Sequence, residues 1–222
     1  MTVILSQDTR EDAAGVKGTK SNRKAKGDGY LRRAEILRAA ERIFVERGYE
    51  GATIRKIADE VGVSSTALYM HFRDKDQILL EICTGAMERL LAGSTEIAAL
   101  PVDAVTRVRM MLEGYIRFAL ENPNAYQLVF MSRQPFADEP DKRHLAMDLG
   151  NQCRETFLGP IREIAAQGRL RTGDPRAAHQ ALWAAGHGMI ALMITKPGFD
   201  WVPADELTRV LLDGLLFGLI AD

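Results

Sequence analysis

The sequence contains little of what disulfides and membrane spans require. Its two cysteines, Cys83 and Cys153, lie far apart within helical patterns, so we expect packed, reduced thiols and no structural bridge. No run of eighteen apolar residues occurs, and Val3-Ile4-Leu5 is too short for the hydrophobic region of a signal peptide. These absences predict a cytoplasmic protein without a membrane partner.

Catalytic signatures are missing as well. The four histidines are His71, His144, His179 and His187, and none belongs to an HExxH motif or lies near a nucleophile elbow. The sequence has no glycine-rich phosphate loop and no paired CxxC. We therefore do not expect an enzyme, a cofactor or a bound metal.

Charge is distributed unevenly along the chain, although the net charge is only −1. Residues 1–75 hold 15 Lys and Arg against 11 Asp and Glu, whereas the remainder holds 14 against 19. A basic front and an acidic rear suit a molecule that approaches DNA in one orientation. With 222 residues and 46% hydrophobic residues, the chain is long enough for one large domain or two smaller ones.

A short amphipathic helix is predicted directly after Thr53. Thr53 is a good N-cap, and Gly62 supplies the left-handed residue that ends such a helix. Four apolar residues at the spacing i, i+3, i+4 and i+7 give the helix one buried stripe. These residues are Ile54, Ile57, Ala58 and Val61.

A second helix follows after a tight turn. Val63 plugs the turn, and either Ser64 or Ser65 caps the helix. Leu68 and Phe72, at i and i+4, point inward and hold it against the first helix. Two helices joined in this way form a helix-turn-helix, the unit that places its second helix in the DNA major groove.

The outward face of the second helix suits a DNA groove. It carries Thr66, Ala67, Tyr69 and Met70, which combine small, hydroxyl and aromatic groups and no charge. Small side chains let a helix lie deep in the groove, where methyl and hydroxyl groups meet base edges. Hydrogen bonds to phosphate oxygens are expected from Thr53, Tyr69, His71 and Lys75. The alternative for Tyr69 and His71 is packing against the first helix.

The pattern is part of a longer stretch that resembles a known family. From about residue 31 to residue 80, the sequence is similar to the N-terminal domain of the TetR (tetracycline repressor) family, with few departures. The matching positions are Glu35-Ile36-Leu37, Ala39-Ala40, Ile43-Phe44, Gly48-Tyr49, Gly51, Thr53, Ile57-Ala58, Val63-Ser64-Ser65-Thr66-Ala67-Leu68-Tyr69, His71-Phe72 and Lys75.

The resemblance implies an all-α homodimer that represses transcription and leaves its operator when a small molecule binds the C-terminal domain. We expect about nine helices, with a three-helix helix-turn-helix domain at residues 30–76 and a larger effector-binding and dimerisation domain at residues 77–222. The base-reading positions hold Ser65, Thr66 and Ala67, so operator specificity should lean on DNA shape or on other residues. The candidate DNA contacts are Thr53, Ser64, Ser65, Thr66, Ala67, Tyr69, His71 and Lys75, with Arg32 and Arg33 added.

The first 29 residues are polar and rich in Gly, Lys and Ser, which predicts a disordered basic arm. From residue 17 to residue 33, seven Lys and Arg accompany the single acid Asp28. One interpretation is a solvated tail. The other is an arm that adds phosphate contacts or enters the adjacent minor groove.

The rest of the chain is predicted to be helical, since it shows no alternating strand pattern. Asp74 and Gln77 form a capping box at the start of the fourth helix, and Gly159-Pro160 predicts a kink or break in a later one. A loop is expected at residues 132–140. The expected helices cover residues 31–47, 74–91, 103–121, 124–131, 141–167, 174–195 and 204–220.

The last two predicted helices are apolar around much of their circumference. In a monomer their outer faces would form a large exposed apolar patch, so a twofold dimer through these helices is expected. Close helix approach would be allowed by Gly186, Gly188, Gly214 and Gly218.

Aromatic residues and methionines recur in the middle helices. Most should belong to the core, but a cavity lined by some of them would accept a flat or flexible apolar molecule. Charge in this region is sparse, which argues against a highly charged ligand. Trp183-x-x-x-His187-Gly188 resembles a C-terminal domain type found in part of the TetR family, and His187 is either a core histidine or a ligand contact. The candidate pocket residues are Met111, Tyr115, Phe118, Tyr126, Phe130, Phe157, Trp183 and His187.

Together these observations predict a homodimeric repressor that a small, largely apolar ligand releases from a pseudo-palindromic operator. The alternative is a constitutive DNA-binding dimer, architectural or co-regulatory, whose C-terminal core is filled.

Overall fold

The structure is a computed structural model that describes residues 28–132 and 140–221. These residues form nine α-helices and one π-helical segment, with no β-strand beyond an isolated bridge between Leu170 and Ile220, so the all-α class is confirmed. The helices are α1 (Asp28–Gly51), α2 (Ile54–Glu60), α3 (Ser65–Tyr69), α4 (Lys75–Ala98), α5 (Ala104–Glu121), α6 (Pro123–Tyr126), η1 (Gln127–Met131), α7 (Pro140–Ala166), α8 (Pro175–Thr195) and α9 (Ala204–Leu219).

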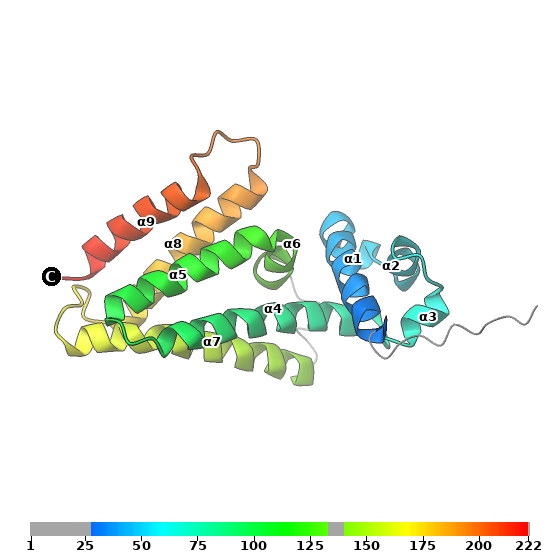
Figure 1. Cartoon of the computed structure of the whole chain (residues 1–222), viewed down its shortest axis with the longest axis horizontal. Helices are drawn as coiled ribbons and strands as arrows, with labels where there is room; N and C mark the ends of the chain where they lie inside the picture. The colour runs from blue at the N-terminus through cyan, green and yellow to red at the C-terminus, as the bar shows by residue number, and fades with distance from the viewer. Residues whose placement is uncertain (1–27, 133–139, 222) are drawn as a thin grey trace, which may run out of the picture.

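The helices form two lobes that α4 connects (Figure 1). Helices α1 to α3 form a small lobe around the first half of α4, and α5 to α9 surround its second half in a larger lobe. Because one continuous helix runs through both lobes, a change in its position in one lobe also moves the other end.

Caps and glycines define the small lobe as the sequence predicted. Helical geometry breaks at Gly48, whose φ is 67°. The Thr53 hydroxyl accepts a hydrogen bond from the Lys56 amide, and Gly62 takes a φ of 66° after α2. Of the two candidate serines, Ser64 caps α3 by accepting from the Ala67 amide. These confirmed features fix the angle between the two short helices.

Some boundaries differ from the prediction. Helix α1 begins at Asp28, three residues early, and α4 continues to Ala98 although residue 91 was expected to end it. The extension of α4 follows from tertiary contacts, since this part packs along α5 and α7. Helix α7 continues through Pro160 without a break, and the kink predicted there stays a prediction. At the start of α4, Asp74 accepts from the Gln77 amide, but the Gln77 side chain bonds the Arg73 amide instead of closing the box on Asp74.

A short segment between the lobes belongs to both cores. Ala125 of α6 and Leu128 of η1 are buried in the hydrophobic core of the small lobe, against side chains of α1 and α4. Tyr126, between them, is buried in a separate cluster with Ile116 and Ile190 of the large lobe. The α6–η1 segment therefore provides a second connection between the lobes, beside α4.

The predicted arm falls outside the described residues except for its last two, and so does most of the predicted loop, at residues 133–139. Within the described ranges, none of the helices combines the length and the apolar character that a bilayer crossing demands.

Candidate functional site

A groove on the small lobe brings together four of the predicted DNA contacts. It is lined by Thr53 at the start of α2, by Ser65 and Tyr69 of α3, and by Lys75 at the start of α4. These residues come from three segments, so the turn geometry of the small lobe is what places them together. Hydroxyl groups and an ammonium group suit an oxygen-rich, anionic partner, and the groove also has one carboxylate on its wall, that of Glu50.

The exposed face of α3 has the chemistry that the sequence predicted. Thr66 and Ala67 are exposed, as are Tyr69 (55%) and Met70 (83%). The packing interpretation of Tyr69 is therefore not supported by its position. His71 is half-buried, and its backbone carbonyl accepts a hydrogen bond from Arg33, so this residue is tied to α1.

Lys75 is engaged inside the small lobe while it lines the groove. Its ammonium group donates to the Tyr49 carbonyl at 3.0 Å and lies 3.9 Å from the centre of the Tyr49 ring. Glu50 lies 3.9 Å away, and the Tyr49 hydroxyl donates to Asp76. Burial and the bond to Asp76 raise the pKa of Tyr49, which keeps this hydroxyl protonated as a donor. Lys75 thus anchors the start of α4 to the end of α1.

Arg32 and Arg33 differ from each other in the structure. The Arg33 guanidinium bonds the Glu81 carboxylate with Nε at 2.8 Å, and it lies 4.0 Å above the Phe72 ring. These contacts hold α1 against α4, so Arg33 helps to maintain the fold, and its predicted DNA contact stays a prediction. Arg32 pairs with Glu35 at 2.9 Å and remains partly exposed.

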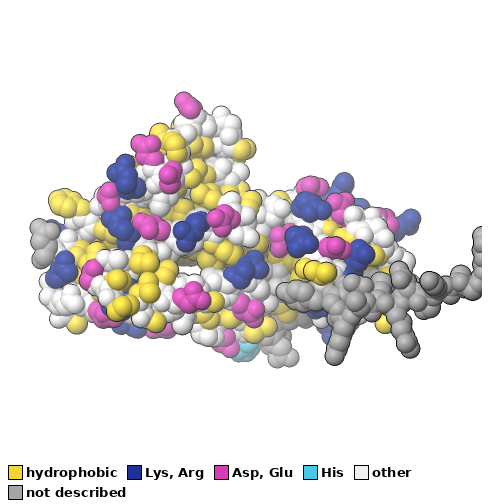
Figure 2. Space-filling model, in the orientation of Figure 1, with side chains coloured by type: hydrophobic (Ala, Val, Ile, Leu, Met, Phe, Trp, Pro, Cys, Tyr) yellow, Lys and Arg dark blue, Asp and Glu magenta, His cyan; other side chains and the backbone are white. Residues whose placement is uncertain are grey.

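The groove also contains a basic residue that the sequence analysis missed. Arg55 lines it, and its side chain is 86% exposed with Asp59 at 3.9 Å. The sequence did offer a signal for Arg55, since it is a basic residue on the outer face of α2, two residues after the Thr53 cap. Basic and acidic side chains are interspersed on the visible face of the small lobe (Figure 2). For contacts with an anionic partner, the positions of individual cations therefore matter more than the net charge of the lobe.

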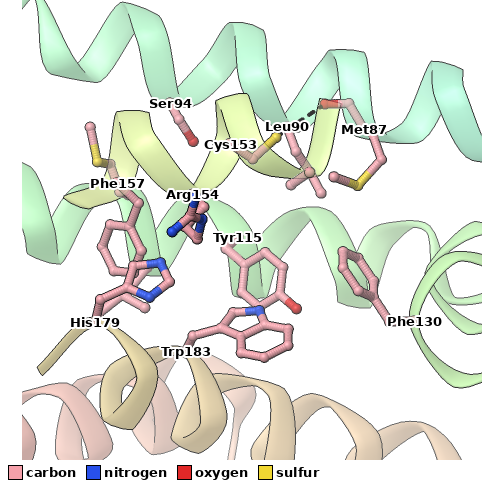
Figure 3. A pocket seen from close by; sticks show the side chains of 13 residues that line it. Met87, Leu90, Ser94, Tyr115, Phe130, Cys153, Arg154, Phe157, His179 and Trp183 are labelled. Atoms are coloured by element: carbon pink, nitrogen blue, oxygen red, sulfur yellow. Dashed lines mark hydrogen bonds between the residues drawn. The ribbon is translucent and has the colours of Figure 1, made fainter. Parts of the chain in front are cut away.

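The large lobe contains a mostly apolar cavity of about 270 Å³ between α4, α5, α7 and α8 (Figure 3). Five of the eight predicted pocket residues line it, which are Met111, Tyr115, Phe130, Phe157 and Trp183.

The other three predicted pocket residues lie elsewhere. Phe118 lines a separate hollow between α4 and α5. Tyr126 is fully buried, with its hydroxyl oxygen 3.1 Å from the Tyr115 hydroxyl and 2.5 Å from Nδ1 of His187. His187 thus joins the cavity indirectly, through tyrosines that connect it to the cavity wall.

Several cavity residues were missed because tertiary packing decides which face of a helix turns inward. Helix α4 contributes Met87, Leu90 and Ser94. Helices α7 and α8 add the polar side chains of Arg154 and His179. The expectation of sparse charge was therefore incomplete, since a guanidinium group lines the cavity.

Burial sets the charge state of the polar groups near the cavity. It raises the pKa of Tyr115 to about 12 and lowers the pKa of His187. The pKa of His179 is lowered by burial and by the neighbouring Arg154 charge. At neutral pH these tyrosine and histidine side chains are therefore uncharged hydrogen-bonding groups.

Helices α8 and α9 keep an apolar surface that the other described residues leave uncovered. Leu192 of α8 is 51% exposed, and Val210 and Phe217 of α9 are 54% and 78% exposed. A Cβ atom added at Gly214 or Gly218 would meet no described atom within 4 Å. Hydrophobic side chains are also visible at this end of the molecule in Figure 2.

Two family models match the chain. Residues 36–82 match "Bacterial regulatory proteins, tetR family", and residues 108–215 match "Tetracyclin repressor-like, C-terminal domain". Together they cover more than two thirds of the sequence, including the groove on the small lobe and most of the cavity.

Individual proteins give the same result. The transcriptional repressor KstR2 of Rhodococcus jostii is 29% identical over 198 residues, which cover 83% of this chain and 91% of KstR2. The transcriptional activator FasR of Mycolicibacterium smegmatis is 33% identical over 99 residues, 45% of each protein.

A solved structure shares both the fold and part of the sequence. The TetR family regulator PfmR from Thermus thermophilus superposes with a TM-score of 0.70 at 28% identity, covering 82% of this chain and 97% of PfmR. The chain therefore belongs to the TetR family, and it is a DNA-binding transcriptional regulator rather than an enzyme.

Proposed function

We propose that the protein is a homodimeric repressor that a small, largely apolar ligand releases from its operator. The small lobe, with a boundary near residue 76, is the DNA-binding part, and the following helices bind the ligand and form the dimer. The repressor assignment follows KstR2, a relative that matches over most of its length and is named a repressor. FasR, an activator, matches over less than half of its length.

The proposed DNA interface consists of α3 and the groove beside it. Ser65, Thr66 and Ala67 would face the bases, while Thr53 and Tyr69 would bond phosphate oxygens. Ser64, His71 and Arg32 stay candidates at its margin. Lys75 would supply charge from the floor of the groove, and Arg55 is added on the basis of its exposed position.

The proposed dimer forms through the exposed faces of α8 and α9. On α9, Val210, Gly214 and Phe217 follow at i, i+4 and i+7, so they share one face. Their exposure would leave an apolar stripe in water, and association of two copies removes it. Two small lobes held by one dimer can meet successive major grooves of a pseudo-palindromic operator.

The proposed release depends on one observation, namely that α4 contributes to both sites. Lys75, its first residue, lines the groove, while Met87, Leu90 and Ser94 line the cavity. A ligand that prefers another position of α4 would change the spacing of the small lobes. A preference of about 1–3 kcal/mol would change operator affinity roughly 5–150-fold.

A constitutive dimer without an inducer is the alternative, and the cavity speaks against the filled core that it requires. The test is a screen of apolar and amphipathic compounds against a Trp201→Phe variant, in which Trp183 of the cavity wall is the remaining tryptophan. Compounds that shift its fluorescence are then tested for displacement of operator DNA by fluorescence anisotropy. Displacement supports release, whereas binding without any change in operator affinity supports the constitutive dimer.

Dimer formation is tested on the surface itself. Phe217→Glu places a charge on the α9 stripe, and we expect a monomer in sedimentation that binds operator at least about 100-fold more weakly, since the second half-site is lost. Phe199→Glu is the matched control, because Phe199 is also exposed (62%) but lies between α8 and α9. A Phe217→Glu variant that remains dimeric would rule out this interface.

A further inference from the structure

The cavity wall carries a positive charge without an acidic partner inside it. Arg154 of α7 lines the cavity, and none of the described residues that line it is an aspartate or a glutamate. The remaining wall is made mainly of Met, Leu, Phe, Tyr and Trp side chains. Such a site combines one cation with an otherwise apolar surface.

Three polar residues lie on one side of the cavity, whereas the Tyr115 hydroxyl points toward the other side. In Figure 3, Arg154, His179 and Ser94 lie on one side of the cavity, and Met87 and Phe130 lie on the other. The Arg154 side chain is half exposed, at 50%, which places it where water still reaches the cavity. His179 is only 9% exposed and stacks on Phe157 at 5.2 Å between ring centres. Arg154 therefore marks a solvent-facing end of the cavity, its mouth, and the buried His179 lies on the same side.

The surroundings of Arg154 leave it able to bind an additional anion. Its Nη2 lies 3.2 Å from Glu155 Oε1, but Glu155 also accepts from Arg162 at 2.9 Å and is exposed. A neutral ligand that filled the mouth would remove water from the guanidinium and offer no compensating charge. A carboxylate would accept two parallel hydrogen bonds from it instead.

We propose that the ligand of this cavity is an amphipathic carboxylic acid, with its carboxylate on Arg154 and His179 at the mouth and its hydrocarbon body against the apolar wall. His179 acts as a neutral hydrogen-bond donor. A volume of about 270 Å³ is at the small end for ligand pockets, which favours a hydrocarbon body of medium length. This inference rests on the proposed function only in using the same cavity, because it concerns which ligand binds and not what binding does to DNA.

The experiment compares three probes of equal chain length by isothermal titration calorimetry on the full chain, without DNA and below micelle-forming concentrations. The probes are decanoate, 1-decanol and decyltrimethylammonium. We expect decanoate to bind at least tenfold more tightly than decanol, and the cation to bind most weakly. Equal binding of decanoate and decanol, or absence of decanoate binding up to millimolar concentration, would overturn the proposal.

Two variants on the exposed side of α7 identify the responsible charge. Arg154→Met keeps an unbranched side chain and should remove the preference for decanoate while leaving decanol affinity within about twofold. Glu155→Gln removes the competing carboxylate and should strengthen decanoate binding. An unchanged decanoate-to-decanol ratio in Arg154→Met would contradict the assignment.

Operator binding is measured separately with the same probes. If decanoate binds through Arg154 but does not displace operator DNA, the ligand class stands and the proposed release is wrong. If a neutral apolar compound displaces the operator while decanoate does not bind, release stands and the ligand class is wrong.

Discussion

Two arginines, one in each lobe, stand in contrasting surroundings. Arg33 in the small lobe bonds the Glu81 carboxylate and the His71 carbonyl and lies over the Phe72 ring. Arg154 in the large lobe pairs with an exposed glutamate at the surface and faces a cavity. The first guanidinium has its donors used within the fold, whereas the second is positioned for a group from outside.

The hydrophobic cores of the two lobes also differ. In the small lobe, Ile36, Ile57 and Leu68 are each fully buried in one cluster that extends onto α4. In the large lobe, two clusters lie apart, and the cavity opens between four helices. A filled core holds one arrangement, while a core with a void can repack around a ligand. The comparison teaches that the small lobe, the proposed DNA-binding part, has a filled core, whereas the large lobe, the proposed ligand-binding part, has room to repack.

The largest expected effect comes from removing a side chain from the filled core. Phe72→Ala should reduce the free energy of unfolding of the small lobe by about 3–5 kcal/mol, because Phe72 is 1% exposed and also supports Arg33. DNA binding should be lost, while the cavity still binds its probe. Urea unfolding followed by circular dichroism measures the first effect, and Trp183 fluorescence the second. Met70→Ala, at an exposed position of the same segment, is the control for the unfolding measurement.

A change of pH should have a smaller effect on the free energy of unfolding, and this effect should be confined to the large lobe. Burial lowers the pKa of His187 below its usual 6.5, so the folded state binds fewer protons than the unfolded state near that pH. The stabilisation is present above about pH 6.5 and is lost as pH falls. The free energy of unfolding should therefore drop between pH 7.5 and pH 5.5, and less in His187→Asn. Equal pH slopes in the two proteins would contradict a neutral His187.

The small lobe was largely predictable from sequence because its signals are local. Thr53, Ser64 and Gly62 act on the backbone within three residues, so their caps and turns could be identified before any tertiary contact was known. The ion pair of Arg33 could not be predicted, for the opposite reason. Its partner Glu81 lies 48 residues away, and nothing in the local pattern distinguishes an internal ion pair from a phosphate contact.

The cavity was predictable only in part. Tyr115 and Phe157 were identified because aromatic residues in the middle helices are the usual walls of apolar pockets. Arg154 and His179 were missed, because their positions depend on how α7 and α8 turn toward α4. Unless the rotation of a helix about its axis is known, a charged residue on it is expected to face solvent.

Filling the cavity should stabilise the protein modestly, whereas Phe72→Ala and low pH should destabilise it. Cys153→Leu adds apolar volume to the cavity wall, and we expect the free energy of unfolding to rise by about 1 kcal/mol. Decanoate affinity should fall in the same variant, since the added side chain occupies the ligand's space. Asn151→Leu adds an apolar side chain at an exposed position of α7 and should change neither quantity. A destabilised Cys153→Leu would mean that the cavity cannot accept the added volume and is more rigid than the comparison implies.

The smallest expected effect is a change in DNA affinity, caused by a substitution in the small lobe that leaves its fold intact. Tyr69 is 55% exposed and lies on the groove, so Tyr69→Phe removes a hydroxyl that the fold does not need. Unfolding should be unchanged, and DNA affinity should fall by about 1 kcal/mol per half-site, roughly fivefold. Because the hydroxyl is assigned to a phosphate, the loss should be equal on operator and on unrelated DNA in fluorescence anisotropy. A loss restricted to the operator would instead make Tyr69 a base-reading residue, and the α3 surface would then read sequence with its aromatic group as well as with Thr66 and Ala67.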